Sequence, residues 1–231
     1  MDSAQRVLLE RYAEMLANAP LNLVAKGDRD DVWGRHVAEA IRVVEALQAR
    51  EGERWLDLGT GGGLPGVVLA ALRPDVTVTM LDARAKKVRA VQGFVTDLRI
   101  ANAVAIAGRA EALARQPEHR ERYDGVVSRA VGRLDVVAEL SRGFLRPGGR
   151  LAVVRGADAD AELTSVSDVL ERIGFEAFAR LGIAGAPRVT NVVTMQATGS
   201  APGWLPRADG IPQSAPIGGA PSGTMRATRG S

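Results

Sequence analysis

Apolar residues near the start of the chain recur at the spacing of helices. The first set of such positions is Val7, Leu8, Tyr12, Met15 and Leu16, and it ends near Pro20. A second helix is expected to start around residues 28–31, with apolar positions at Val32, Val37, Ile41, Val44 and Leu47. Residues 1–50 are therefore predicted to form an N-terminal helical extension.

The pattern changes at Arg54, where short runs rich in β-forming residues begin. These runs are RWLDLG, VTVTML, AVAIA, YDGVVS and GRLAVV. Helical patterns lie between them, such as AKKVRAVQGFVTDLRI at 85–100. Strands that alternate with helices through right-handed crossovers form a mostly parallel sheet with helices on both faces. An α/β, Rossmann-like domain is therefore predicted for residues 51–198, and its last two runs, FEAFARLGI and PRVTNVVTMQA, are predicted to form a C-terminal edge hairpin.

The composition changes again at Gly199. Residues 199–231 are rich in Pro, Gly, Ser and Ala, which is typical of tails and linkers that have little to bury. We expect this tail to be partly disordered, above all in roughly its last fifteen residues.

The composition limits the class of protein. The chain has 231 residues, of which 46% are hydrophobic, and this suffices for one domain with a sizeable core. No apolar run reaches the roughly eighteen residues of a membrane span, and the amphipathic N-terminus lacks the features of a signal peptide. The absence of cysteine excludes disulfides and thiolate sites, and two histidines disfavour a metal centre. We expect a soluble cytoplasmic protein without metal or membrane partner.

Arginine dominates the basic residues. The net charge is +3 and the isoelectric point is about 9.8, while Lys26, Lys86 and Lys87 are the lysines. Arginine is suited to bidentate contacts with phosphates and base edges. A GC-rich genome would produce the same bias, so both interpretations stay open at this point.

A glycine cluster follows the first β-rich run, in WLDLGTGGGLPGVVLA at 55–70. Gly61, Gly63 and Gly66 match the GxGxxG pattern of dinucleotide-binding turns. Gly59, Gly61 and Gly63 match a different spacing, GxGxG, which is preceded by Asp57. The pyrophosphate of a dinucleotide would face the Asp57 carboxylate unfavourably. S-adenosylmethionine has no phosphate, and a carboxylate attracts its sulfonium and ammonium groups. No lysine followed by Ser or Thr comes after the cluster, which excludes a P-loop.

Two acidic residues further along suit an adenosine. Asp82 ends the second run, about twenty residues beyond the turn, where a carboxylate can accept both ribose hydroxyls. NAD-binding proteins use the same device, and Asp82 could also cap the following helix. In GRAEAL, at 108–113, the backbone of Ala110 and the carboxylate of Glu111 could contact adenine. Glu111 could equally be an ordinary first-turn helix residue.

These segments together resemble one family. DLGTGGGLPG, LDARAKKVRAVQGF, GRAEAL, YDGVVSRAVGRL and LRPGGRLAVVRG come in the order and spacing of the bacterial small-subunit ribosomal RNA guanine-N7 methyltransferases, RsmG, also called glucose-inhibited division protein B. The resemblance covers residues 5–217, including LNLVAKGDRDDVWGRHVAEA upstream and LPRADGIPQSAPI downstream. The Leu-Pro after the glycine cluster and the Ser-Arg-Ala after the fourth run are specific to it, whereas the glycine cluster alone is not.

The resemblance implies a class I fold that uses S-adenosylmethionine, and it assigns roles to residues. The cofactor positions, with those of the glycine turn, are Asp57, Gly59, Gly61, Gly63, Leu64, Asp82, Ala110, Glu111 and Arg129. The positions on the side of 16S ribosomal RNA, or of the small ribosomal subunit, are Asn22, His36, Lys86, Arg109 and Arg188. His36 and Arg129 are the expected catalytic residues. The chain departs from the family at Val24, Glu39 and Arg155, where threonine, aspartate and lysine are usual.

The implied reaction needs no general base, because guanine N7 carries a free lone pair at neutral pH. The enzyme has to hold N7 in line with the methyl group, and Arg129, Arg109 and Lys86 are candidates for phosphate and base-edge contacts. A methyltransferase for a small molecule or a protein is the first alternative. A nicotinamide-dependent oxidoreductase is disfavoured by Asp57, and an RNA-binding module without activity is disfavoured by the intact glycine turn.

Overall fold

The protein is built on one twisted sheet. A computed structural model describes residues 1–129, 132–186 and 188–219. Within these residues the sheet has seven strands in the order β3-β2-β1-β4-β5-β7-β6. Their bounds are β1 Arg54–Leu58, β2 Thr77–Asp82, β3 Ala103–Ala107, β4 Tyr123–Arg129, β5 Leu145–Arg155, β6 Phe175–Gly182 and β7 Asn191–Ala197. Strands β1 to β5 are parallel, and β7 runs antiparallel between β5 and β6. The predicted parallel sheet with a C-terminal hairpin is confirmed.

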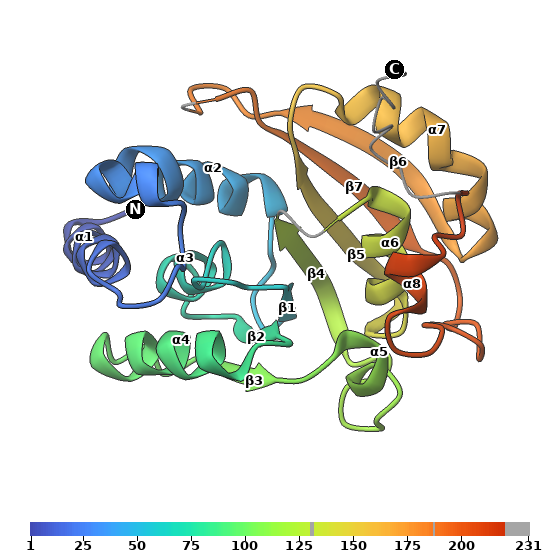
Figure 1. Ribbon diagram of the computed structural model, residues 1–231, viewed down its shortest axis with the longest axis horizontal. Coiled ribbons are helices and arrows are strands. Elements are labelled where there is room, and N and C mark those ends of the chain that lie inside the picture. Colours follow the sequence, from blue (N-terminus) through green and yellow to red (C-terminus); the bar gives the residue numbers. More distant parts are fainter. Residues whose placement is uncertain (130–131, 187, 220–231) are drawn as a thin grey trace, which may run out of the picture.

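Helices cover both faces of this sheet (Figure 1). One face carries α1 Ser3–Ala17, α2 Ala38–Leu47, α3 Gly66–Leu72 and α4 Ala85–Asp97. The other carries α5 Ala110–Leu113, α6 Leu134–Arg142, α7 Ala159–Arg172 and α8 Ile211–Ser214. Successive side chains of a strand point to opposite faces, so Trp55 of β1 enters the first core while Leu56 and Leu58 enter the second. Both faces are buried, which explains why β1 reads as an apolar run without alternation.

The N-terminal region packs directly on the sheet. Leu9, Tyr12 and Leu16 of α1 are fully buried in the same core as β1 and β4. The expected second helix is divided into a 3₁₀ turn, η1 Lys26–Asp31, a π-helical turn, η2 Trp33–Val37, and α2. Asp31 accepts a hydrogen bond from the Gly34 amide at 2.8 Å, and a Cβ at Gly34 would lie 2.6 Å from this carboxylate. π-Helical turns are frequent at functional sites.

The Pro/Gly-rich segment packs on the domain as far as residue 219. Leu205 is fully buried in the core beneath α6. Arg207 forms an ion pair with Glu139 of α6 at 2.7 Å, and the Gly210 amide donates to Glu111 of α5 at 2.9 Å. The end of the segment expected to be disordered, residues 220–231, lies outside the described residues. No helix in the described chain is long and apolar enough to cross a membrane.

Candidate functional site

The carboxyl ends of β1, β2 and β4 lie side by side at one edge of the sheet. The strand order changes direction between β1 and β4, which creates the crevice in which α/β sheets bind ligands. Asp57 near the end of β1, Asp82 at the end of β2 and Arg129 at the end of β4 all reach this crevice. The sheet therefore brings together three of the residues predicted to bind the cofactor.

Asp57 is fully buried at the start of the glycine turn. Its Oδ2 accepts hydrogen bonds from Thr60 Oγ1 at 2.6 Å and from the Gly66 amide at 2.9 Å. Its Oδ1 is buried with no hydrogen-bond partner in the described chain. Burial raises the pKa of Asp57 to about 6, against the effect of these hydrogen bonds and of Arg129. An unpaired buried carboxylate oxygen is costly, and a cationic ligand group would satisfy it.

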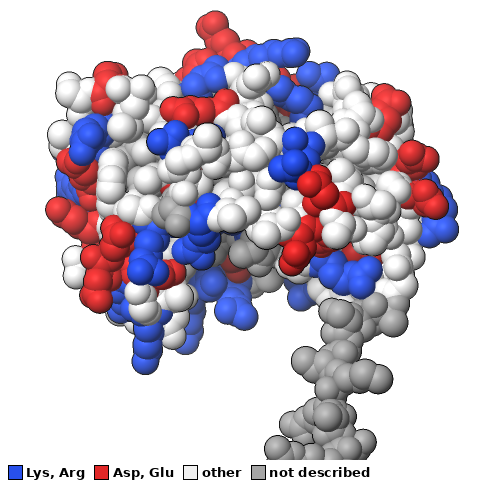
Figure 2. Space-filling model, turned by 90° about the horizontal axis from the view of Figure 1, so that it is seen from above, with Lys and Arg blue, Asp and Glu red and all other residues white. Residues whose placement is uncertain are grey.

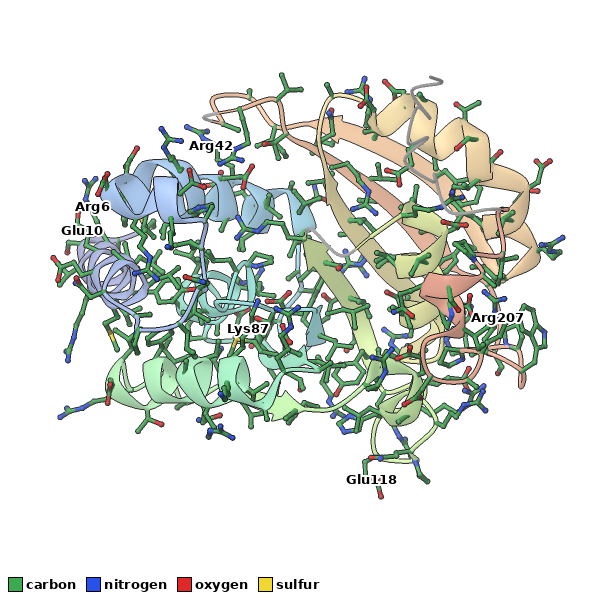
Figure 3. All side chains as sticks on the ribbon, viewed as in Figure 1. Arg6, Glu10, Arg42, Lys87, Glu118 and Arg207 are labelled. Carbon is green, nitrogen blue, oxygen red and sulfur yellow. The ribbon has the colours of Figure 1, made fainter. Side chains whose placement is uncertain are left out.

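Asp82 organises the turn from the second strand. Its Oδ2 accepts a hydrogen bond from the Gly61 amide at 3.1 Å, and its Oδ1 accepts one from the Arg84 amide at 2.8 Å. Gly61 has φ +59°, and a Cβ there would meet no atom closer than 3.9 Å, the distance to the Gly59 carbonyl and to Lys87 Nζ. Lys87 is labelled in Figure 3. The backbone of the turn is thus exposed to an open space of the kind that a ligand can fill.

A small cavity adjoins the ends of β1 and β2. Its volume is about 110 Å³, and its lining is Leu58, Leu81, Ala83, Gly108, Arg109, Ala110, Glu111, Leu140 and Gln213. Ala110 and Glu111, the two residues predicted to contact adenine, therefore both line this cavity. Glu111 is 2% exposed and accepts hydrogen bonds from Arg109 at 2.7 Å and from the Gly210 amide at 2.9 Å. The Pro/Gly-rich segment contributes Gln213 to this wall, which the sequence pattern did not indicate.

A larger cavity of about 480 Å³ lies at the ends of β4 and β5. Its charged and polar lining is Asp28, His36, Glu39, Arg129, Arg155, Arg188 and Thr190. The buried carboxylate of Glu39 accepts hydrogen bonds from Arg129 at 3.1 Å and from Thr190 Oγ1 at 2.7 Å. Arg129 is thereby held between this cavity and Asp57. The predicted residues His36, Arg129 and Arg188 are brought together here from the N-terminal region, β4 and the β6–β7 turn.

His36 sits in the π-helical turn and is 8% exposed. Its Nε2 lies 3.0 Å from Asp28 Oδ2, as in an ion pair, and both ring nitrogens are buried with no hydrogen bond in the described ranges. Burial and then the charge of Arg129 lower the pKa of His36, so the ring is neutral at pH 7. Asp28 also pairs with Arg35 at 3.0 Å and faces Arg188 at 3.8 Å.

The other residues predicted to contact RNA are dispersed. Asn22 is exposed just before Leu23, which lines the larger cavity, and Lys86 is exposed in the first turn of α4. Arg109 lines the smaller cavity and pairs with Glu111 and, at 3.6 Å, with Asp209. Sequence reasoning missed Asp28, Thr190 and Gln213. The run GDRDD holds three aspartates, and nothing in it distinguishes Asp28 from its neighbours.

Comparisons with known proteins identify the family and the fold of the chain. The family model for rRNA small subunit methyltransferase G matches residues 5–179. Proteins named ribosomal RNA small subunit methyltransferase G are similar to this chain: one from Gloeobacter violaceus is 36% identical, covering 94% of this chain and 88% of its own, and one from Mycobacterium sp. (strain KMS) is 40% identical, covering 72% and 73%.

Solved structures share the fold at low sequence identity. A predicted O-methyltransferase from Agrobacterium tumefaciens has a TM-score of 0.58 at 17% identity, covering 69% of this chain and 80% of its own. The fibrillarin pre-rRNA processing protein of Methanococcus jannaschii has a TM-score of 0.54 at 17% identity, covering 65% and 69%. The fold is thus that of class I S-adenosylmethionine-dependent methyltransferases, and the chain belongs to the rRNA small subunit methyltransferase G family.

Proposed function

We propose that the protein transfers a methyl group from S-adenosylmethionine to N7 of a guanine in small-subunit (16S) ribosomal RNA. The observation that carries this proposal is the adjacency of two sites. A glycine turn with the buried carboxylate of Asp57 and the half-buried one of Asp82 stands next to a cavity lined by His36, Arg129 and Arg188. Similar proteins are named for the same RNA. Because the substrate is ribosomal RNA, we infer that the enzyme works in the cytoplasm.

The residues of the first site fit the methyl donor, whose sulfonium supplies an electrophilic methyl group. Asp57 offers the unpaired Oδ1 to the cationic end of the donor. Gly59 and Gly61 are half-buried and leave backbone accessible, whereas Gly63 is buried and would hold the shape of the turn. Asp82 would accept hydrogen bonds from the ribose. Leu64 closes the turn from the core side, and Ala110 and Glu111 border the cavity that suits adenine.

The second site supports a reaction without a general base. No side chain has to remove a proton from guanine N7, so the protein contributes by positioning the base and excluding water. Arg129, fixed by Glu39, is placed to donate to O6 or a phosphate while leaving N7 free. We propose that Asn22, Lys86, Arg109 and Arg188 contact the RNA around the target.

The charge on one face of the protein suits local rather than continuous contact with RNA. On the face seen in Figure 2, basic and acidic side chains are interspersed. A long single-sign groove would instead indicate recognition of an extended strand. We therefore expect the enzyme to recognise a folded RNA surface through a few phosphate contacts and one inserted base.

Methylation of RNA from a strain that lacks this enzyme tests the proposed function. Small subunits, and RNA extracted from them, are incubated with labelled S-adenosylmethionine, and the modified base is mapped by cleavage at N7-methylguanine and by mass spectrometry. We expect one N7-methylguanine in the small-subunit RNA of at least one of the two substrates. Transfer to neither substrate, or to another atom of the RNA, would overturn the proposal.

The affinity for S-adenosylmethionine is expected to fall below about pH 6, where Asp57 takes up a proton. The cationic donor prefers the ionised carboxylate, so its affinity follows the ionised fraction, which drops about tenfold per pH unit below the pKa. Calorimetric titration between pH 5 and pH 8 measures this dependence. Asp57→Asn is the control, because it is expected to bind weakly with a nearly flat pH profile. An unchanged slope in Asp57→Asn would assign the dependence to another group.

A further inference from the structure

We infer that His36 accepts a hydrogen bond through Nδ1 from the exocyclic N2 amino group of the target guanine, and that Asp28 is the positioning residue that gives His36 this role. The inference rests on the proposed function, since it assigns the larger cavity to the target base. It names one contact that would distinguish guanine from bases without an amino group at that place.

The geometry around His36 leaves its Nδ1 available to a ligand. The residue is 8% exposed and lines the larger cavity. Neither ring nitrogen has a hydrogen bond in the described chain, but Nε2 lies 3.0 Å from Asp28 Oδ2, whereas Nδ1 has no such neighbour. Buried polar atoms are nearly always paired in folded proteins. A ligand that enters the cavity is therefore the natural partner of Nδ1.

Asp28 determines whether Nδ1 donates or accepts. A neutral imidazole carries its proton on one nitrogen, and the group beside the other nitrogen selects the tautomer. Asp28 Oδ2 lies 3.0 Å from Nε2 and, as a carboxylate, can only accept. It therefore favours a proton on Nε2, which leaves a lone pair on Nδ1. Arg35, Arg129 and Arg188 are the cations around this pair. Burial, and then the charge of Arg129, lower the pKa of His36, which favours the neutral ring.

The chemistry of guanine matches an acceptor at this position. When N7 is presented to the methyl donor, the Watson–Crick edge with N1–H and the N2 amino group points elsewhere in the cavity. The N1–H stands next to O6, whose lone pairs would face the lone pair of Nδ1. The amino hydrogen on the Watson–Crick edge has N1–H beside it, which is a donor and not an acceptor, so this hydrogen is the better partner. Arg129, Arg155 and Arg188 supply donors for O6 in the same cavity.

Replacement of the target guanosine by inosine, which lacks only the N2 amino group, tests the contact. RNA with guanosine or inosine at the mapped position is assembled by ligation. The kcat/KM for each RNA is measured with saturating S-adenosylmethionine. For the wild-type enzyme we expect inosine to be methylated at least roughly tenfold more slowly, because Nδ1 stays buried without a partner. For His36→Ala we expect guanosine and inosine to react at similar rates.

The Asp28→Asn variant tests whether Asp28 sets the tautomer of His36 or only supports the local structure. An amide can donate to Nε2, which moves the ring proton to Nδ1 and turns the acceptor into a donor. We expect the guanosine preference to disappear in Asp28→Asn. Asp30→Asn, an exposed acid-to-amide change in the same 3₁₀ turn, is expected to keep the wild-type preference. Circular dichroism and S-adenosylmethionine binding verify that each variant is folded.

The possible outcomes separate this inference from the proposed function. Equal wild-type rates on guanosine and inosine would overturn the inference while the function stands. The same follows if Asp28→Asn slows both substrates equally and retains the preference. Failure of the wild type to methylate the guanosine RNA would overturn the proposed function and this inference with it.

Discussion

Gly61→Arg is expected to abolish binding of S-adenosylmethionine, with a loss in affinity of at least roughly a hundredfold, while the protein remains folded. Gly61 lies in the middle of the turn, and a side chain there would enter the open space between the Gly59 carbonyl and Lys87. The left-handed backbone at Gly61, with φ +59°, adds strain of about 1–2 kcal/mol for a residue with a Cβ. Calorimetric titration with S-adenosylmethionine measures the loss.

Gly52→Arg is a matched control for this substitution. Gly52 is an exposed glycine with φ +77° in the turn before β1, at the opposite edge of the sheet, and a Cβ there would meet no atom within 4 Å. The same side chain on a similarly strained backbone should cost similar stability and leave binding unchanged. If Gly61→Arg binds S-adenosylmethionine as tightly as Gly52→Arg does, the glycine turn is not the cofactor site.

The strands were the most predictable part of the fold. Residues 103–107 form β3 as expected, and β1 ends one residue before the predicted run does. Both faces of β1 are covered, so its burial requires a nearly continuous apolar run, whereas β3 lies at the end of the strand order and is partly exposed. The exceptions are β7, which begins at Asn191 although the predicted run begins at 187, and β5, which begins at Leu145 and includes the sequence Pro-Gly-Gly. Leu145 pairs with Tyr123, and the register of β4 and β5 is irregular after this pair. Pro-Gly-Gly is typical of a turn, so the sequence did not indicate that the strand begins before it.

The pieces of the N-terminal region could not be derived from apolar spacing. The second set of apolar positions predicts one helix, but the structure has a 3₁₀ turn, a π-helical turn and α2 in its place. The apolar residues still face the core, because each kind of turn can present them there. The interruption depends on the local contact of Asp31 with the Gly34 amide, which the hydrophobic pattern does not encode.

The two parts of the site differ in how much the sequence showed. Asp57, the glycines and Asp82 follow consecutive strands, so their chemistry and their meeting at one edge could be predicted. The larger cavity is assembled from distant segments: Thr190 donates to Glu39 across 151 positions, and Asp28 meets His36 in an irregular turn. Such contacts depend on tertiary packing, for which short-range patterns carry no signal. The resemblance to the family indicated His36 and Arg188 but not their partners.

Composition also gave little information about residues 199–219. Pro, Gly and Ser predict a segment with little to bury, yet the domain holds this segment through carboxylates that accept its backbone amides. Glu121, Glu111 and Asp135 bond the amides of Ala201, Gly210 and Gly218. Polar anchoring of this kind requires few apolar residues in the segment itself. It therefore leaves no hydrophobic pattern that a sequence analysis could find.

Arg207→Ala is expected to lower the free energy of unfolding by about 3 kcal/mol, near the lower end of the cost of breaking a buried ion pair. Arg207 (labelled in Figure 3) donates to Glu139 from Nε at 2.8 Å and from its guanidinium NH2 at 2.7 Å. Glu139 is fully buried, so its charge would lose both contacts and keep only the backbone amide of residue 207, at 3.0 Å. In a chain of this size such a loss lowers the melting temperature by roughly 6–12 °C.

The same substitution should weaken binding of S-adenosylmethionine, because Arg207 anchors the segment that places Gln213 in the wall of the smaller cavity. Two variants make the test specific. Arg6→Ala breaks an exposed ion pair with Glu10 and is expected to cost less than about 1 kcal/mol. The double variant Arg207→Ala/Glu139→Gln also removes the buried charge of Glu139. It should recover part of the stability but not the affinity for S-adenosylmethionine, since residue 207 still lacks its side-chain contact with residue 139. Thermal unfolding and calorimetry measure both quantities. A loss in Arg207→Ala no greater than in Arg6→Ala would show that the segment is held without this ion pair.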